Sequence, residues 1–200
     1  MKKLFAIIVV IVIAFQLQAQ DLGLLNSIKT TNEKIKSFEA DLSNTMVKPK
    51  KTTSQEGKLY FVTPYEFAAL FDKNFMIVNE QKIKMDIGLF NGTYKLRNGG
   101  MMQSLANIFL YGFQGRIQQL ADENGYNLTT KTENGYHIVT GTIIKKKLIG
   151  IGYKQVIFKY HTDSLLLKEI VLCDYNGNMD TYTISNVKYD VKVDSNTFRF

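Results

Sequence analysis

The sequence predicts an α+β protein built on an antiparallel β-sheet, for three reasons. Apolar and polar residues alternate over many short segments, as they do in strands with one buried face. Asn-Gly pairs, which favour tight turns between strands, occur five times. From Met101 to Leu120 the apolar residues instead recur every three or four positions, which is the period of a helix. Short strands joined by tight turns favour an antiparallel sheet over a parallel one.

The composition fits one folded domain and narrows its chemistry. The chain has 200 residues, of which 45% are hydrophobic and 22% are charged, and its formal net charge is +7. Its single Cys excludes a disulfide within the chain, and its two His leave little material for a metal site or an acid–base relay. The sequence contains neither a Gly-x-Ser-x-Gly turn nor a phosphate-binding loop. We therefore expect no enzymatic activity, no bound metal and no cofactor.

The first residues predict a signal peptide. Lys2 and Lys3 precede the apolar run Leu4–Phe15, and a polar stretch with the small residue Ala19 follows. This run is shorter than the ~20 residues that a membrane-spanning helix needs. We expect residues 1–19 to be removed on export, which leaves residues 20–200 as one soluble domain; the alternative is an uncleaved anchor. Because an exported protein does not meet intracellular nucleic acid, we expect no nucleic-acid partner despite the positive charge.

The first half of the mature chain predicts one helix followed by strands. Helical spacing of apolar residues favours a helix over Leu22–Lys36, and alternation over Phe38–Met46 predicts a strand. The Lys-rich segment Lys48–Gly57 predicts a solvated loop at the tip of a hairpin. Further strands are expected at Lys58–Val62, which Pro64 ends, and at Glu66–Phe71, Phe75–Asn79 and Ile83–Leu89.

The second half begins with the helical segment and continues as a strand meander. Gly112 and Gly115 predict a break within Met101–Leu120, so that two short helices replace one long helix. Asn134-Gly135 predicts a two-residue hairpin turn. The expected strands are Tyr126–Thr132, Tyr136–Ile144, Gln155–His161, Leu165–Tyr175, Asp180–Val187 and a short terminal strand at Phe198–Phe200.

Some of these predicted strands are apolar on both faces, such as Leu59-Tyr60-Phe61-Val62 and Val156-Ile157-Phe158. A sheet in a small domain usually leaves one face in water, so such strands need cover on both sides. The segment Met101–Leu120 is a candidate cover. Two interpretations stay open at this point. One is an ordinary core between sheet and helices, and the other is a strongly curved sheet whose helices enclose an apolar cavity.

Five blocks of the mature chain agree in order and spacing with a known family. They are Ile35-Lys36-Ser37-Phe38-Glu39-Ala40-Asp41-Leu42, Gly57-Lys58-Leu59-Tyr60-Phe61-Val62-Thr63-Pro64-Tyr65-Glu66-Phe67, Ile170-Val171-Leu172-Cys173-Asp174-Tyr175-Asn176-Gly177-Asn178, Tyr182-Thr183-Ile184-Ser185-Asn186-Val187 and Phe198-Arg199-Phe200. On these blocks the chain resembles the outer-membrane lipoprotein carrier family, the LolA-like proteins. The resemblance covers nearly all of the mature chain and rests on a diffuse pattern, without a catalytic signature.

The resemblance implies an incomplete antiparallel β-barrel with helices that form a lid over an apolar cavity. Proteins of this family shelter lipoprotein acyl chains and move them through the periplasm, from an inner-membrane lipoprotein-releasing transporter to an outer-membrane acceptor. The expected protein is thus a soluble, periplasmic, non-enzymatic carrier. The alternatives are a carrier of another lipid or apolar envelope molecule in the same fold, and an envelope sensor or scaffold that binds protein partners.

Strand alternation and the resemblance together predict which side chains contact lipid. The set combines strand residues with residues of the lid: Leu59, Phe61, Phe67, Phe71, Met76, Val78, Leu105, Phe109 and Phe113. Two positions depart from the family. Its well-known members carry an Arg just before the proline, which holds the lid by hydrogen bonds to backbone carbonyls, where this chain has Thr63. They carry a Trp where this chain has Ala69, so both the latch and the pocket shape should differ.

Overall fold

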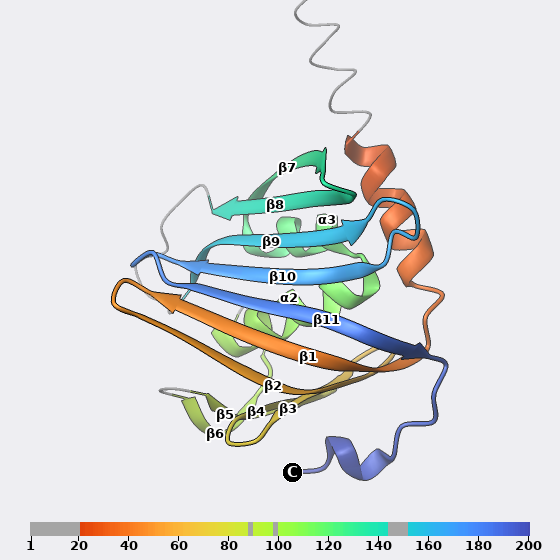
Figure 1. Ribbon diagram of the computed structural model, residues 1–200. Coiled ribbons are helices and arrows are strands. Elements are labelled where there is room, and N and C mark those ends of the chain that lie inside the picture. Colours follow the sequence, from red (N-terminus) through yellow and green to blue (C-terminus); the bar gives the residue numbers. More distant parts are fainter. Residues whose placement is uncertain (1–20, 88–89, 98–99, 144–151) are drawn as a thin grey trace, which may run out of the picture.

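Eleven antiparallel strands form a single sheet in the part of the chain that the computed structural model describes, residues 21–87, 90–97, 100–143 and 152–200 (Figure 1). The predicted signal peptide, residues 1–19, lies outside the described residues. Residues 21–32 are helical. The other elements are β1 (Ser37–Lys48), β2 (Lys51–Val62), β3 (Glu66–Phe71), β4 (Phe75–Asn79), β5 (Lys82–Ile87), β6 (Phe90–Lys95), α2 (Met101–Gln114), α3 (Ile117–Asn124), β7 (Tyr126–Glu133), β8 (Tyr136–Ile143), β9 (Tyr153–His161), β10 (Leu167–Asp174), β11 (Met179–Tyr189) and a 3-10 helix (Ser195–Phe198).

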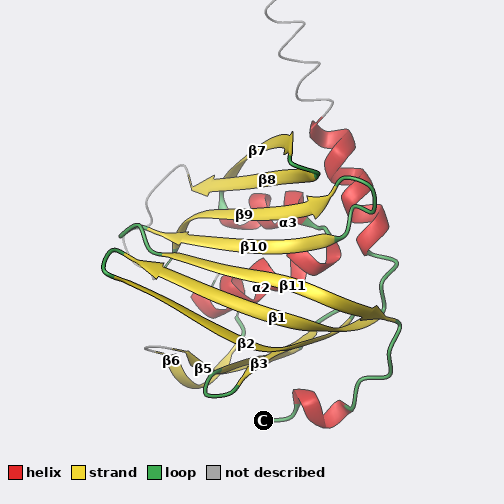
Figure 2. Ribbon diagram, viewed as in Figure 1, coloured by secondary structure: helices red, strands yellow, loops and turns green. Residues whose placement is uncertain are grey.

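The sheet consists of two meanders that meet where the first strand pairs with the last. Its order is β6-β5-β4-β3-β2-β1-β11-β10-β9-β8-β7, with Leu42 of β1 opposite Ile184 of β11. The sheet curves without closing, and α2 and α3 lie together on its concave side (Figures 1 and 2). The helix of residues 21–32 lies beside the turn between β9 and β10 (Figure 1). The predicted α+β fold, an incomplete antiparallel barrel with helices over its interior, is therefore confirmed.

Local sequence accounts for most of these elements. In β1 the alternating residues Phe38, Ala40 and Leu42 are all buried, as a strand with one face toward the core requires. The Asn134-Gly135 turn joins β7 to β8, as predicted. The predicted break in the helical segment is also confirmed, because α2 ends at Gln114 and α3 begins at Ile117.

Two predictions of secondary structure are wrong, and one strand was missed. The expected loop Lys48–Gly57 is mostly strand, because each residue from Lys51 to Gly57 pairs with a residue of β1. Its polar composition reflects exposure on both faces near the hairpin tip. The expected terminal strand at Phe198–Phe200 is absent from the structure, because Phe198 is the last residue of the 3-10 helix and the next two residues are irregular. The Asp194 side chain caps the N-terminal end of this helix. The strand β6 was not predicted, because Asn91-Gly92 within it has the composition of a turn.

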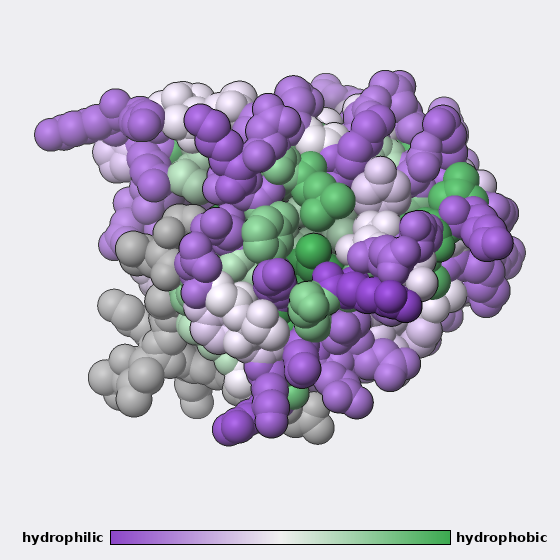
Figure 3. Space-filling model, turned by 90° about the horizontal axis from the view of Figure 1, so that it is seen from below, coloured by the Kyte–Doolittle hydropathy of each residue, from purple (hydrophilic) through white to green (hydrophobic). Residues whose placement is uncertain are grey.

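The 3-10 helix covers the convex side of β3. This helix contacts β3 and β4, Phe198 within it is buried, and the Phe198 carbonyl accepts a hydrogen bond from the Asn79 amide. Phe67, Ala68 and Ala69 are consequently all buried, although they point alternately to the two faces. Seen from below, apolar side chains gather in the middle of this side of the molecule and hydrophilic ones surround them (Figure 3). Both faces of β3 are thus covered by other parts of the chain, whereas Tyr60 and Val62 of β2 are only half-buried on the convex face.

Candidate functional site

The predicted lipid-contact residues come together on the concave side of the sheet, beneath α2. Seven of them are at most 3% exposed and belong to one hydrophobic cluster, namely Leu59, Phe61, Phe67, Met76, Val78, Phe109 and Phe113. Phe71 and Leu105 are half-buried and pack against the margin of the same cluster. Alternation along β2, β3 and β4 places the strand residues of this set on the concave face of the sheet. The helical period places Leu105, Phe109 and Phe113 on the side of α2 that faces the sheet. Whether these nine side chains contact a lipid remains a prediction.

Aromatic rings from α2 fill the interior of the curved sheet. The Phe113 ring is the centre of this aromatic cluster, with its centroid 5.5 Å from that of Phe38, 5.4 Å from Phe61 and 5.7 Å from Phe67. One turn earlier, the Phe109 ring lies 5.1 Å from Tyr182 in an edge-to-face arrangement. Such pairs add about 0.5–1.5 kcal/mol each to ordinary apolar burial. The rings of Phe109 and Phe113 thus fill the space between α2 and the sheet.

Sequence reasoning missed two members of the aromatic cluster. Phe38 of β1 and Tyr182 of β11 contact the rings of α2 as closely as the predicted residues do. The sequence contained a signal for both residues. Phe38 shares a strand face with the apolar Ala40, and Tyr182 shares one with the apolar Ile184, which is the pattern of a buried face. The strands β1 and β11 become neighbours only through pairing between the two ends of the chain, so their joint contribution was not visible locally.

Two hydrogen bonds, one buried and one partly buried, join α2 to the sheet and to the turn after β2. Gln114, the last residue of α2, donates from Nε2 to the carbonyl oxygen of Pro64 at 2.6 Å. The Tyr160 hydroxyl of β9 donates to the carbonyl oxygen of Gly112 at 2.8 Å. Burial raises the pKa of Tyr160 well above its ordinary value, so the phenol keeps its proton and stays a donor. Gln114 of α2 and Tyr160 of β9 thus each donate to a backbone carbonyl across the gap between α2 and the rest of the fold. We call these two hydrogen bonds the latch of α2.

The helix of residues 21–32 is attached to the end of α2 as well. Asn32 donates from Nδ2 to the carbonyl oxygen of Leu165 at 2.7 Å, in the turn between β9 and β10. Glu33, just after that helix, pairs with Arg116 between α2 and α3 at 2.7 Å. Both side chains of this ion pair are about one third exposed, so it contributes at most ~1 kcal/mol. These contacts link three helical elements at one end of the interior.

The other end of the concave face carries polar side chains. Asp180 lies on the same face of β11 as Tyr182, and its buried Oδ1 atom has no hydrogen-bond partner among the described residues. Nearby, the Gln55 amide donates to Oδ1 of Asn44 at 3.1 Å. Burial raises the pKa of the Asp180 carboxyl, while the side chains of Asn44 and Lys48 oppose that shift. The charged form of Asp180 is therefore disfavoured in the folded state.

Replacing Asp180 with asparagine should stabilise the protein at neutral pH. A carboxyl whose pKa is raised by folding lowers stability as the pH rises from its ordinary value of 3.8 through the folded value. Asp180→Asn removes this loss, so the variant should be the more stable protein at pH 7 and should show a flatter stability profile between pH 4 and 7. Urea unfolding at several pH values measures this, with the exposed Asp163→Asn as the control. Lower stability of Asp180→Asn at pH 7 would contradict the desolvation argument.

The described residues show no group of three or more His, Cys, Asp or Glu side chains placed to hold a metal ion. The two histidines lie on neighbouring strands, where His137 shares a hydrogen bond of 2.8 Å with Thr132 and the ring of His161 packs on Tyr136. No helix in the described ranges has the length and apolar character needed to cross a membrane.

The fold defines the class of this protein, an unclosed antiparallel barrel with helices on its concave side. No family profile and no curated protein matches the sequence. Similar solved structures include a DUF1329 family protein from Desulfovibrio piger, with 13% identity, 88% of this chain and 95% of that chain covered, and a TM-score of 0.48. A domain described as an outer membrane lipoprotein-sorting protein domain from Vibrio parahaemolyticus has 10% identity, the same two coverages and a TM-score of 0.49.

A LolA superfamily protein from Nitrosomonas europaea is also similar, with 8% identity, 88% of this chain and 97% of that chain covered, and a TM-score of 0.41. At these identities the likeness concerns the fold alone.

Proposed function

We propose that this protein is a periplasmic carrier that shelters lipoprotein acyl chains between its curved sheet and α2, on their way from an inner-membrane transporter to an outer-membrane acceptor. The observation that carries the proposal is the position of Phe109 and Phe113, which fill an otherwise apolar interior from a helix that two hydrogen bonds hold in place. An acyl chain offers the sheet the same kind of contact as these rings do. Cargo and lid therefore compete for one apolar surface.

The free energy gained by burying an acyl chain can be compared with the free energy lost when α2 moves away from the sheet. Burial is worth about 0.8 kcal/mol per methylene, so a 16-carbon chain gains about 12 kcal/mol when it leaves water. Opening the lid withdraws two buried phenylalanine rings, at about 1.5–3 kcal/mol each, and breaks two hydrogen bonds with a net value of about 0.5–1.5 kcal/mol each. Loading with an acyl chain is favourable on this balance. A membrane or protein that binds the open lid could then release the cargo by shifting the equilibrium.

The cargo can differ from that of the well-known carriers while the fold stays the same. Ala69, which stands in the place of the family Trp, is 3% exposed and lies opposite Leu59 and Met76 in the sheet. Because alanine is smaller than tryptophan, neighbouring side chains and α2 form this part of the interior surface. A carrier of another lipid or apolar envelope molecule is therefore the second candidate, and the identity of the bound species distinguishes the two.

The latch provides the test. Tyr160→Phe removes the hydroxyl that holds the Gly112 carbonyl and keeps the buried ring, so it should favour the open lid. We expect protein purified from the periplasm to carry a lipidated species in native mass spectrometry. We also expect Tyr160→Phe to take up a fluorescent 16-carbon fatty acid about threefold to tenfold faster than the parent protein, as the loss of about 0.7–1.4 kcal/mol implies.

Tyr94→Phe is the matched control, because its hydroxyl contacts the Asn91 carbonyl at 3.5 Å on β6, outside the lid. It should load at the parental rate. If the purified protein is empty and neither it nor Tyr160→Phe takes up the fatty acid, the carrier function is wrong, and the envelope sensor or scaffold becomes the better explanation. Equal uptake by Tyr160→Phe and Tyr94→Phe would show that the latch does not control entry.

A further inference from the structure

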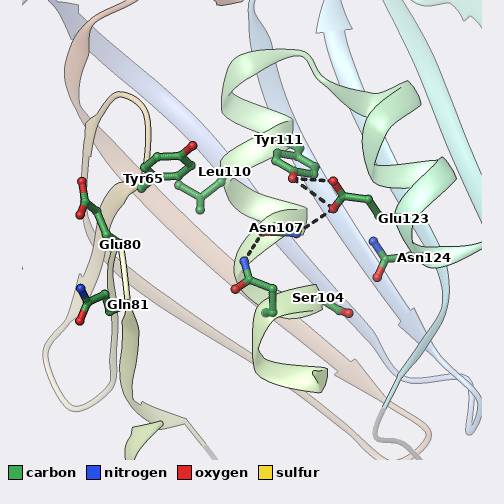
Figure 4. A pocket seen from close by; sticks show the side chains of 10 residues that line it. Tyr65, Glu80, Gln81, Ser104, Asn107, Leu110, Tyr111, Glu123 and Asn124 are labelled. Atoms are coloured by element: carbon green, nitrogen blue, oxygen red, sulfur yellow. Dashed lines mark hydrogen bonds between the residues drawn. The ribbon is translucent and has the colours of Figure 1, made fainter. Parts of the chain in front are cut away.

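A groove of about 700 Å³ runs over α2, between the turn that joins β4 to β5 and helix α3 (Figure 4). Helix α2 supplies its floor, with Gln103, Asn107 and Tyr111 on the side opposite Phe109 and Phe113. Tyr65 from the turn after β2, together with Glu80 and Gln81 from the turn between β4 and β5, forms one wall. Glu123 and Asn124 of α3 form the other, and Ser104 and Leu110 complete the lining. The volume lies within the range of about 300–1,000 Å³ that is usual for small-molecule sites.

A network of hydrogen bonds holds the floor and one wall in place. Asn107 accepts from Gln103 at 2.7 Å and donates to Glu123 at 3.1 Å (Figure 4). The Tyr111 hydroxyl donates to the same carboxylate, at 3.0 Å from Oε1 and 3.1 Å from Oε2, and Gln119 donates to it at 2.9 Å. Burial and the neighbouring Glu123 raise the pKa of Tyr111 to about 12, so this phenol remains a donor. The carboxylate charge is thus spread over neutral donors.

The groove offers both hydrogen-bond donors and hydrogen-bond acceptors to a ligand. Within the described residues, no hydrogen bond or ion pair involves the side chains of Tyr65, Glu80 and Gln81. Gln103 and Asn107 each have one amide N–H left over, and the oxygen of Gln103 is also free to accept. A ligand that both donates and accepts, group after group, matches this lining. Hydroxyl groups have that property, whereas an ammonium group only donates and a phosphate or carboxylate anion only accepts.

The lining also excludes other classes of ligand. An anion would meet two carboxylates, from Glu80 and Glu123, with no Lys or Arg among the lining residues to offset them. An acyl chain would find only one aliphatic side chain, that of Leu110. The Tyr65 side chain, by contrast, is 49% exposed and offers an aromatic ring to the C–H face of a sugar. We propose that this groove binds a neutral carbohydrate of two or three rings.

The carbohydrate groove is distinct from the proposed lipid-contact surface, because none of the nine residues proposed to contact lipid lines it. Its test uses protein purified from the periplasm and labelled with 15N, titrated with N,N′,N″-triacetylchitotriose and with maltotriose. At least one of these sugars should cause saturable shifts of amide signals in α2, α3 and the turn between β4 and β5. Tyr65→Ala and Gln103→Leu should each weaken this binding about tenfold or more. Both variants should keep the parental spectrum elsewhere and take up the fatty acid normally.

Tyr175→Ala is the matched control, because it also removes an exposed tyrosine, in the turn between β10 and β11. It should bind the sugar as tightly as the parent. Absence of saturable shifts with both sugars would overturn the proposal, as would unchanged affinity in Tyr65→Ala and Gln103→Leu. Saturable binding of spermidine or inorganic phosphate at these residues without sugar binding would overturn it too, by assigning the groove to a charged ligand.

Discussion

Replacing Phe113 with alanine should lower the free energy of unfolding by about 3–5 kcal/mol. The ring is 3% exposed and contacts the rings of Phe38, Phe61, Phe67 and Phe109, which come from three different elements of the sheet and from its own helix. Those elements are held in the sheet by strand pairing, so they cannot close around the space that the missing ring leaves. The loss should therefore be near the upper end for a core substitution.

Urea unfolding measures the overall loss, and hydrogen exchange shows where it occurs. In Phe113→Ala, amides of α2 should exchange faster than those of β1 and β11, because the ring joins the helix to the sheet. Phe75→Ala is the control, since this residue of β4 is half-buried and its ring packs against Lys84 outside the aromatic cluster. It should cost about 1 kcal/mol. Equal losses in the two variants would mean that α2 is not held by its aromatic contacts.

The two helix-terminal glycines should respond very differently to alanine. Gly115 and Gly125 end α2 and α3 with nearly the same left-handed conformation, at φ of 67° and 73°. A Cβ atom at Gly125 would have no atom within 4 Å, whereas one at Gly115 would lie 2.8 Å from the carbonyl oxygen of Ile28. Gly125→Ala should cost about 1–2 kcal/mol for the left-handed backbone alone. Gly115→Ala should cost a further 1–3 kcal/mol or so, because the helix of residues 21–32 must move away.

The difference between these variants measures the close contact between two helices, since the backbone term is common to both. Urea unfolding of the parent and both variants gives it directly. Gly115→Ala should also load the fluorescent fatty acid faster, because its displaced helix no longer supports the end of the lid near Gly112. Losses within about 0.5 kcal/mol of each other would show that this helix packs loosely and plays no part in holding α2.

Much of the fold could be predicted from local sequence. The alternation of Phe38, Ala40 and Leu42, the turn at Asn134-Gly135 and the break at Gly115 each depend on neighbouring residues, and each occurs as predicted. The failures have the same origin. Lys51 to Gly57 has the composition of a loop, yet pairing with β1 makes it a strand. Phe198 was expected in a terminal strand, yet it is the buried last residue of a 3-10 helix that packs against β3 and β4.

The candidate site was predictable in part for a similar reason. Period and alternation were sufficient to place Phe61, Phe67 and Phe113 on surfaces that face each other, because these periods are properties of single elements. The latch was not predictable. The hydroxyl of Tyr160 and the carbonyl of Gly112 are separated by 48 positions, and no local rule relates a tyrosine in a strand to a glycine in a helix.

The sequence by itself therefore determined the α+β class, the antiparallel sheet and the apolar character of the interior, since turn residues and hydrophobic period act over a few residues. Only the tertiary structure decided what occupies that interior. The sequence is compatible both with a packed core and with an open apolar cavity between sheet and helices, because the two require the same apolar residues. The curvature of the sheet brings β1 to β4 and β11 around one helix, and the rings of Phe109 and Phe113 fill the space between them. The surface that we propose for cargo is thus the surface that the lid now covers.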